Sequence, residues 1–212
     1  MKPLILLNSA PDRETLREAF LKSYNDWYFK EDYELKVVIE RNSIHLLRQR
    51  EVINDGFKRP IVIIDDDMLF TQETNFWQSI SFLQNNENVG MITNGWKFGA
   101  NMKRAIKDEF VKRKLVFTGG GMVLSIKAQK VIADMPQEKY WSDNVAWSIE
   151  CTKAGLQNYY YRGSMAIHKV CQKGGRKAFL AESEFVHHPN IKPNIGVSGQ
   201  ILISTEKDIK WD

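Results

Sequence analysis

Short apolar runs alternate with segments of helical periodicity along most of the chain. The apolar runs, several of them rich in β-branched residues, predict strands at residues 4–7, 35–39, 61–64, 90–93, 122–124 and 159–162. Between these runs, apolar residues three or four positions apart predict helices at residues 12–24, 45–53, 74–84, 126–133 and 144–154. Strands that alternate with helices in this way predict an α/β fold, with a mostly parallel central sheet flanked by helices.

The same pattern predicts which faces of two elements are buried. Every residue at 61–64 is apolar, so this strand should be covered on both faces of the sheet. One stripe of the helix at 74–84 is expected to face the core, and it consists of Phe76, Trp77, Ile80 and Leu83.

Composition limits the class of protein. The chain has 212 residues, of which 43% are apolar and 26% are charged, which is typical of a globular protein and excludes wholesale disorder or a fibre. We therefore expect one domain over residues 1–212. No apolar run approaches the ~20 residues that cross a bilayer, so no membrane insertion is expected. Cys151 and Cys171 lack zinc-ligand spacing, which favours a reducing, cytoplasmic location.

Three consecutive carboxylates, Asp65, Asp66 and Asp67, follow the apolar strand at 61–64 directly. Ligands of parallel α/β sheets bind at the carboxyl ends of strands, and adjacent like charges favour a compensating cation. Because side chains alternate along a strand, Asp65 and Asp67 can point to one side. Oxygen ligands of this kind suit Mg²⁺ or Mn²⁺ bridging to a phosphate, so the triplet predicts a metal site. The alternative is a solvated acidic turn.

The run Ile63-Ile64-Asp65-Asp66-Asp67 resembles the Asp-x-Asp motif of GT-A nucleotide-sugar glycosyltransferases, most closely the family-2-like branch. Haloacid-dehalogenase phosphatases also carry Asp-x-Asp, but on their first core strand, whereas here it follows the third. Other similar segments follow in the family's order, at residues 88–92, 117–125, 141–147 and 165–168. The resemblance implies a single GT-A domain, with a nucleotide-binding half at 1–95, an acceptor-side half at 96–170 and a C-terminal loop or tail at 171–212.

The resemblance assigns the catalytic position to Asp143 and Asn144, which lie twelve and eleven residues before the helix-stopping Gly155. The family has two acidic residues there, and in inverting members the second is the general base. An asparagine cannot accept a proton in that role. Either Asp143 is the base, or the reaction retains the anomeric configuration and needs no such base. Asp143 alternatively serves only as a helix cap.

The resemblance also implies a donor site and a metal site. Metal binding, by Mn²⁺ or Mg²⁺, falls to Asp67 with Asp65 and His168, and His187 and His188 compete with His168 for that role. The glycines at 119–121 either shape the donor-sugar pocket or form a plain turn. The full set of expected donor-binding residues is Asn8, Ser9, Glu40, Arg41, Asp65, Asp66, Gly119, Gly120, Gly121 and Arg176.

Charge and aromatic residues bear on the acceptor. The formal net charge is +4, and cations concentrate at residues 102–114 and 169–177. These segments bind phosphate or a polyanionic acceptor, or they form solvated basic faces. Trp96 and Trp141 are the expected acceptor contacts. A compact, slightly basic GT-A enzyme is similar to phage-type enzymes that glycosylate hydroxymethylated DNA bases from UDP-sugars, in which case it would act in the host cytoplasm.

Other functions stay open. The acceptor is alternatively a glycan, a lipid-linked molecule or a protein. A nucleotidyltransferase on a related fold would need a glycine-rich loop after the first strand, and residues 8–13 contain no glycine. A non-catalytic module that binds nucleotide-sugars also fits, because Asn144 replaces the expected carboxylate.

Overall fold

A single mixed sheet runs through the computed structural model, which describes residues 1–98, 105–140, 143–169, 188–191 and 209. Within these residues the strands lie in the order β2-β1-β3-β7-β5-β8-β4, and β6 pairs with β8. The strands are β1 (Leu4–Ser9), β2 (Glu34–Ile39), β3 (Ile61–Asp65), β4 (Met68–Leu69), β5 (Val89–Phe98), β6 (Phe110–Arg113), β7 (Met122–Leu124) and β8 (Gln157–His168).

Most of these strands share one direction. β1 is parallel to both β2 and β3, and β5 is parallel to β8. The short strand β7 lies between β3 and β5 and is antiparallel to both, so β3 and β5 point the same way. Only β7, β4 and β6 run in the opposite direction among the described strands. The prediction of an α/β fold with a mostly parallel central sheet is confirmed.

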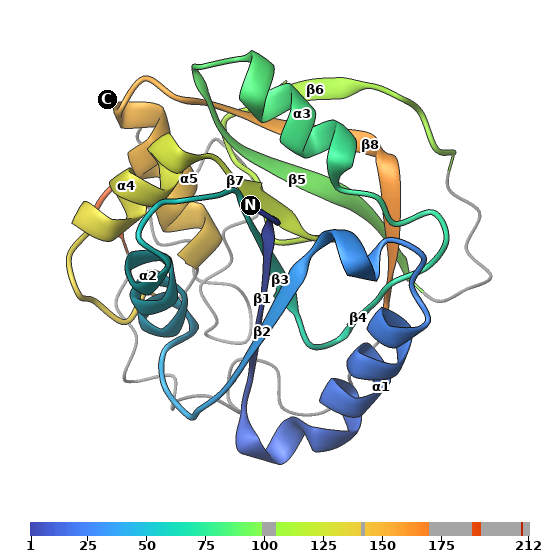
Figure 1. Ribbon diagram of the computed structural model, residues 1–212. Coiled ribbons are helices and arrows are strands. Elements are labelled where there is room, and N and C mark those ends of the chain that lie inside the picture. Colours follow the sequence, from blue (N-terminus) through green and yellow to red (C-terminus); the bar gives the residue numbers. More distant parts are fainter. Residues whose placement is uncertain (99–104, 141–142, 170–187, 192–208, 210–212) are drawn as a thin grey trace, which may run out of the picture.

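Helices cover both faces of the sheet (Figure 1). The helices are α1 (Glu14–Asn25), α2 (Ile44–Asp55), α3 (Trp77–Asn85), α4 (Ile126–Asp134) and α5 (Asp143–Lys153), with short 3₁₀ helices η1 (Pro11–Arg13) and η2 (Lys30–Asp32). Figure 1 shows α2, α4 and α5 gathered on one side, and α1 and α3 along the other. No helix in these ranges is long and apolar enough to cross a membrane.

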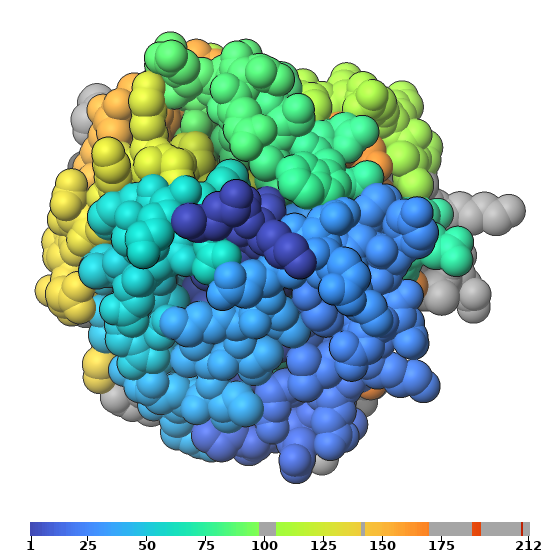
Figure 2. All heavy atoms as spheres, in the orientation of Figure 1, coloured from blue at the N-terminus to red at the C-terminus, as the bar shows by residue number. Residues whose placement is uncertain are grey.

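Alternation along β1 divides the core into two layers. Leu4 and Leu6 pack with residues of α2, α4 and α5, whereas Ile5 and Leu7 pack with residues of α1 and α3. All four side chains are essentially inaccessible to solvent, and each contributes roughly 1.5–3 kcal/mol by burial. Figure 2 shows the dark-blue first residues of the chain at the surface, between the cyan and lighter-blue segments that surround them. The polar ends of β1 and β3 are thereby held on a rigid, two-sided core.

Two local features differ from the pattern in the sequence. Helix α3 begins only at Trp77, whose side chain is 37% exposed and whose indole N–H donates to Asp32 at 3.3 Å, so the prediction that Trp77 faces the core is wrong. Phe76 fills the core just before the helix starts. Strands β4 and β6 were not predicted, because β4 has two residues and β6 carries the exposed Lys112 and Arg113.

Candidate functional site

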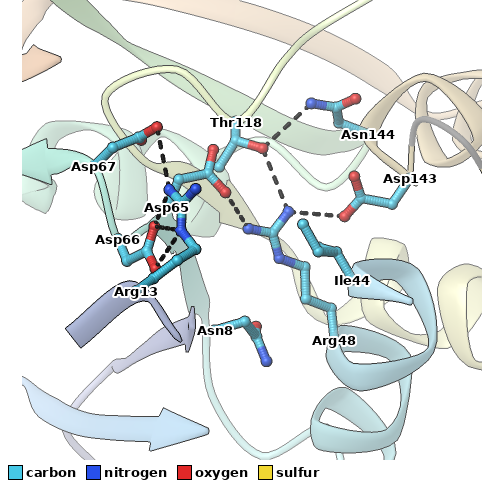
Figure 3. Close-up of a pocket in the computed structure, with 10 residues that line it drawn as sticks. All are labelled: Asn8, Arg13, Ile44, Arg48, Asp65, Asp66, Asp67, Thr118, Asp143 and Asn144. Carbon is cyan, nitrogen blue, oxygen red and sulfur yellow. Dashed lines mark hydrogen bonds and ion pairs between the residues drawn. The ribbon is translucent and has the colours of Figure 1, made fainter. Parts of the chain in front are cut away.

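A cavity of about 170 Å³ opens at the carboxyl ends of β1 and β3 (Figure 3). Side chains from the strand ends, from η1, from α2, from the loop before β7 and from the start of α5 surround it. Its lining residues are Asn8, Arg13, Ile44, Arg48, Asp65, Asp66, Asp67, Thr118, Asp143 and Asn144. The structure therefore brings the acidic triplet and the Asp143–Asn144 pair together in the lining of one cavity.

Asp66 is the most enclosed member of the triplet. Its carboxylate accepts hydrogen bonds from Arg13 Nε at 2.9 Å and Nη2 at 2.6 Å, and from the Ser9 hydroxyl at 2.6 Å. Asp66 is 3% exposed. Both of its oxygens are thus bonded by the turn that follows β1, and Asp66 ties that turn to the end of β3. Ser9, an expected donor contact, is directed to Asp66.

Asp67 lies beside His168. Its Oδ2 is 3.6 Å from His168 Nε2 and 3.6 Å from Arg13 Nη2, while its buried Oδ1 has no hydrogen-bond partner among the described residues. Burial and the neighbouring charge of Asp65 raise the pKa of Asp67 to about 7, although Arg13 opposes this rise. Burial lowers the pKa of His168, which favours its neutral, ligating form.

These two side chains fit a hard divalent cation. A cation would give the buried Oδ1 of Asp67 a partner and would keep this carboxylate ionised. No cluster of three His, Cys, Asp or Glu side chains that could enclose a metal occurs within the described ranges, so further ligands would come from water or substrate. His188 is engaged elsewhere, since its Nε2 is 2.9 Å from Glu150 Oε1 on α5. His187 lies outside the described residues.

Asp143, the first residue of α5, forms an ion pair with a buried arginine. Arg48 Nη1 donates to Asp143 Oδ2 at 2.8 Å, and Nη2 of the same guanidinium donates to Asp65 Oδ1 at 2.5 Å. Burial by itself would raise the pKa of Asp143, but the charge and hydrogen bond of Arg48 lower it below its ordinary value. The helix N-terminus also favours a negative charge there. Asp143 is therefore an ionised carboxylate at neutral pH.

Asn144 is fixed by neighbouring polar groups. Its Nδ2 donates to Thr118 Oγ1 at 3.2 Å, and its Oδ1 accepts from the backbone N–H of Val145 at 3.0 Å. Thr118 also lies within 3.5 Å of Arg48 Nη1. The amide links the loop before β7 to the start of α5 and offers no site for a transferred proton.

Asn8 presents polar atoms to the cavity without a protein partner. It is 2% exposed, and neither its Nδ2 nor its Oδ1 forms a hydrogen bond in the described part of the chain. The Nε of Arg48 is likewise buried and unpartnered. Since buried polar groups are nearly always satisfied, these atoms indicate a polar ligand.

Several expected site residues lie outside the cavity lining. Glu40 pairs with Arg50 at 2.9 Å and Arg41 pairs with Asp12 at 3.1 Å, all four being well exposed to solvent. Trp96 lies near His168, with its ring centre 5.6 Å from that of the imidazole. The expected residues Trp141 and Arg176 fall outside the described ranges.

The glycines at 119–121 pack against the core behind Thr118. A Cβ on Gly120 would lie 2.0 Å from the carbonyl oxygen of Gly95, and one on Gly121, with a φ of +114°, would lie 2.6 Å from Phe76. A Cβ on Gly119 would approach Trp96 to 2.9 Å. These glycines let the loop fit closely against β5 and α3, and none of them lines the cavity.

Sequence reasoning missed Arg13, Arg48 and Thr118. Arg48 had a recognisable signal, since it shares a spacing of four with Ile44 and Val52 on the face of α2 that turns inward. A charged residue on such a face requires a buried partner. Arg13 and Thr118 carried no comparable signal, because their partners Asp66 and Asn144 come from distant segments.

No protein-family model matches the chain, and no curated protein matches it in sequence. Solved structures do match. A197 from STIV superposes with a TM-score of 0.56 at 12% identity, covering 81% of this chain and 87% of A197. The mannosyltransferase PcManGT from Pyrobaculum calidifontis, in complex with GDP-Man and Mn²⁺, gives 0.55 at 13% identity, covering 82% of this chain and 58% of its own.

TarS 1-349 from S. aureus, in complex with UDP-GlcNAc, gives a TM-score of 0.55 at 10% identity. The match covers 85% of this chain and 62% of TarS 1-349, so the chain spans about three fifths of both this structure and the mannosyltransferase. At these identities the likeness concerns the fold. The chain shares the fold of these solved structures, one of which is a mannosyltransferase, in agreement with the predicted α/β architecture.

Proposed function

We propose that this protein is a glycosyltransferase that moves a sugar from a nucleoside-diphosphate sugar, a UDP-sugar in the first instance, to a hydroxyl group. One observation carries the proposal. A single cavity holds a carboxylate with an unpartnered buried oxygen, Asp67, and a second carboxylate kept ionised by an arginine, Asp143. The first suits a metal-bound diphosphate and the second suits an acceptor hydroxyl.

The charge of the cavity supports a requirement for a divalent cation. Its lining contains four aspartates and two arginines, a balance of two negative charges. A diphosphate brought alone into this field would be repelled. Mn²⁺ or Mg²⁺, held by Asp67 and His168, would supply a Lewis acid for the leaving diphosphate. Asp65 lies on the cavity side of Arg48 and is available to the donor nucleoside.

We assign the general base to Asp143. The acceptor oxygen forms a bond to the anomeric carbon, and the bond between that carbon and the diphosphate oxygen breaks. The electron pair of the broken bond stays on the diphosphate, and the hydroxyl proton passes to Asp143. The lowered pKa of Asp143 keeps it deprotonated at neutral pH, which is the form that a general base needs. This role implies inversion at the anomeric carbon.

We propose that the two halves of the chain bind different substrates. Asn8 and the acidic triplet come from residues 1–95, which we propose bind the nucleotide. Thr118, Asp143 and Asn144 come from residues 96–170, which we propose face the acceptor. The unpartnered amide of Asn8 would bond the donor nucleoside.

We further propose a hydroxymethylated base in phage DNA as the acceptor. Support comes from β6 and the residues before it, where Lys107, Lys112 and Arg113 are exposed. Nearby acids are engaged, because Asp108 accepts from Tyr161 and Glu109 pairs with Arg162. Exposed cations such as these can bind the phosphates of a nucleic-acid backbone.

The donor reaction is tested by incubating the protein with UDP- and GDP-sugars, with and without Mn²⁺, and measuring release of nucleoside diphosphate. Metal-dependent release should fall by at least about 100-fold in Asp67→Asn and Asp143→Asn, since each removes a group that acts in the transition state. Glu87→Gln, an exposed carboxylate remote from the cavity, serves as the matched control. Nucleotide-sugar binding without any release would instead identify a non-catalytic binding module.

The acceptor is tested separately, with hydroxymethylated DNA as substrate and mass spectrometry of its nucleosides as the readout. A gain of one sugar mass on the modified base supports the DNA acceptor. Donor turnover without mass gain on DNA, and with gain on an added glycan, lipid-linked or protein acceptor, overturns it.

A further inference from the structure

Arg48 connects carboxylates from the two halves of the site. It belongs to α2, is 1% exposed, and donates both to Asp65 at the end of β3 and to Asp143 at the start of α5. Figure 3 shows its guanidinium between the two side chains, with Thr118 beside it. Arg48 therefore connects Asp65, on the proposed donor side of the cavity, with Asp143, on the proposed acceptor side.

Stability alone does not account for this arrangement. Taking a guanidinium and two carboxylates out of water costs several kcal/mol, and buried ion pairs rarely exceed apolar packing in net stability. Ile44 and Val52 occupy the same inward face of α2, so an apolar residue at 48 would continue the core. An arginine at this position of the cavity wall, whose buried Nε lacks a partner in the part of the chain that the structure describes, indicates a role in the site.

We propose that Arg48 is a positioning residue: it fixes the direction of the Asp143 carboxylate and makes that direction depend on Asp65, which faces the donor. The planar guanidinium donates through two nitrogens at fixed angles, so a shift of Asp65 would move Arg48 and, with it, Asp143. Occupation of the donor side would thus be transmitted to the base. This inference rests on the proposed glycosyl transfer, with Asp143 as base.

The groups around Asp143 come from three segments. Arg48 and His45 approach it from α2, Thr118 contacts Arg48 from the loop before β7, and Asn144 follows it on α5. Of these, Arg48 alone gives Asp143 a side-chain hydrogen bond among the contacts of the described residues. Loss of the two guanidinium donors of Arg48 should therefore leave the Asp143 carboxylate free to rotate, while helix α5 stays in place.

The test compares Arg48→Lys with Arg59→Lys. Lysine keeps the positive charge but its single ammonium cannot reproduce the fork. Arg59 is the matched control, because it also joins two carboxylates, Asp55 and Glu34, away from the cavity. We expect kcat to fall roughly 10- to 100-fold in Arg48→Lys, the cost of misplacing a reacting group by about 1 Å. The affinity for UDP with Mn²⁺, measured by calorimetry, should change by less than about threefold.

A double-mutant cycle isolates the route through Asp143. In an Asp143→Asn background, Arg48→Lys should cost no further turnover, because the residue acts only through the missing carboxylate. The acid limb of the kcat profile should also move to higher pH in Arg48→Lys and stay in place in Arg59→Lys. Should Arg48→Lys fail to fold, Arg48→Gln removes the charge and one of the two donors, and it should likewise move the acid limb to higher pH.

Different results would contradict the proposed glycosyl transfer and the positioning role of Arg48. If the parent protein shows no metal-dependent release of nucleoside diphosphate, the proposed function fails. If the parent turns over but Arg48→Lys loses UDP affinity as much as kcat, Arg48 is a donor contact and the positioning role is wrong. An unchanged kcat and pH profile in Arg48→Lys contradicts it equally.

Discussion

Oδ2 of Asp67 lies 3.6 Å from Nε2 of His168, at the point where β4 meets the end of β8. The antiparallel register sets this distance, since Met68 stands opposite His168 and the amide of Lys169 donates to the carbonyl of Asp67 at 2.7 Å. Two segments far apart in sequence are therefore joined by backbone pairing, which holds the two side chains together on a rigid edge.

This pairing leads to a prediction about metal binding. Asp67→Asn should weaken Mn²⁺ binding in the presence of UDP by about 100-fold, because a charged ligand worth about 3 kcal/mol is lost. His168→Ala should weaken it as well. Electron paramagnetic resonance of free Mn²⁺ gives the affinity. His188→Ala is the control, since His188 bonds Glu150 instead; equal affinity in all variants would rule out a site at Asp67.

Replacing Asn8 with Leu should increase the stability of the fold and weaken the binding of UDP. Replacing it with Leu removes two buried polar atoms that lack partners, so the free energy of unfolding should rise by about 1 kcal/mol. Affinity for UDP should fall about tenfold or more as the amide is lost. Urea unfolding and calorimetry measure the two effects.

Asn158→Leu provides the contrast for Asn8. Asn158 is also buried on a strand, but its Nδ2 donates to the carbonyl of Lys114 at 3.1 Å. Its replacement should lower stability by about 1–3 kcal/mol. Equal destabilisation of both variants would mean that the amide of Asn8 is satisfied in solution.

His45 should make the fold sensitive to acid. Burial lowers the pKa of His45 to about 4, against about 6.5 in an unfolded chain, so the native state holds the neutral ring. Its stabilising effect is complete above pH 6.5 and is lost as the pH falls toward 4, because the unfolded chain gains the proton first. The loss should reach about 3 kcal/mol.

Unfolding in urea at pH 7, 5.5 and 4 measures this loss. His45→Gln keeps an acceptor for the indole N–H of Trp147, which donates to His45 Nδ1 at 2.9 Å, and should flatten the dependence between pH 6.5 and 4. A slope that is the same in the parent and in His45→Gln would assign the acid sensitivity to other groups.

Two glycines with positive φ should respond differently to alanine. Gly121→Ala adds a Cβ 2.6 Å from Phe76 at a φ of +114°, so strain and overpacking should cost about 3 kcal/mol or more. Gly155→Ala has a φ of +79° but no neighbour within 4 Å, and should cost only about 1 kcal/mol. Urea unfolding compares them, and similar values would show that the loop relaxes around residue 121.

The sequence by itself determined the main elements and the position of the acidic triplet. Strand and helix periodicity are local properties, so β1, β3 and α2 could be predicted within a few residues. The triplet follows a fully apolar run, which predicts a carboxylate edge at the end of a buried strand. The role of Asp143 was implied only by the family resemblance, which places an acidic residue about twelve positions before a helix-stopping glycine; Gly155 follows α5 with a φ of +79°.

Only the tertiary structure decided how these parts meet. Arg48 and Asp143 are 95 positions apart, and no local pattern records which distant carboxylate satisfies a buried guanidinium. The same holds for Arg13, whose guanidinium binds the carboxylate of Asp66 across 53 positions of sequence. The order of the sheet, with β7 inserted antiparallel between β3 and β5, also arises from long-range pairing. Periodicity specifies which face of an element is buried, whereas partner choice depends on the packing of the whole chain.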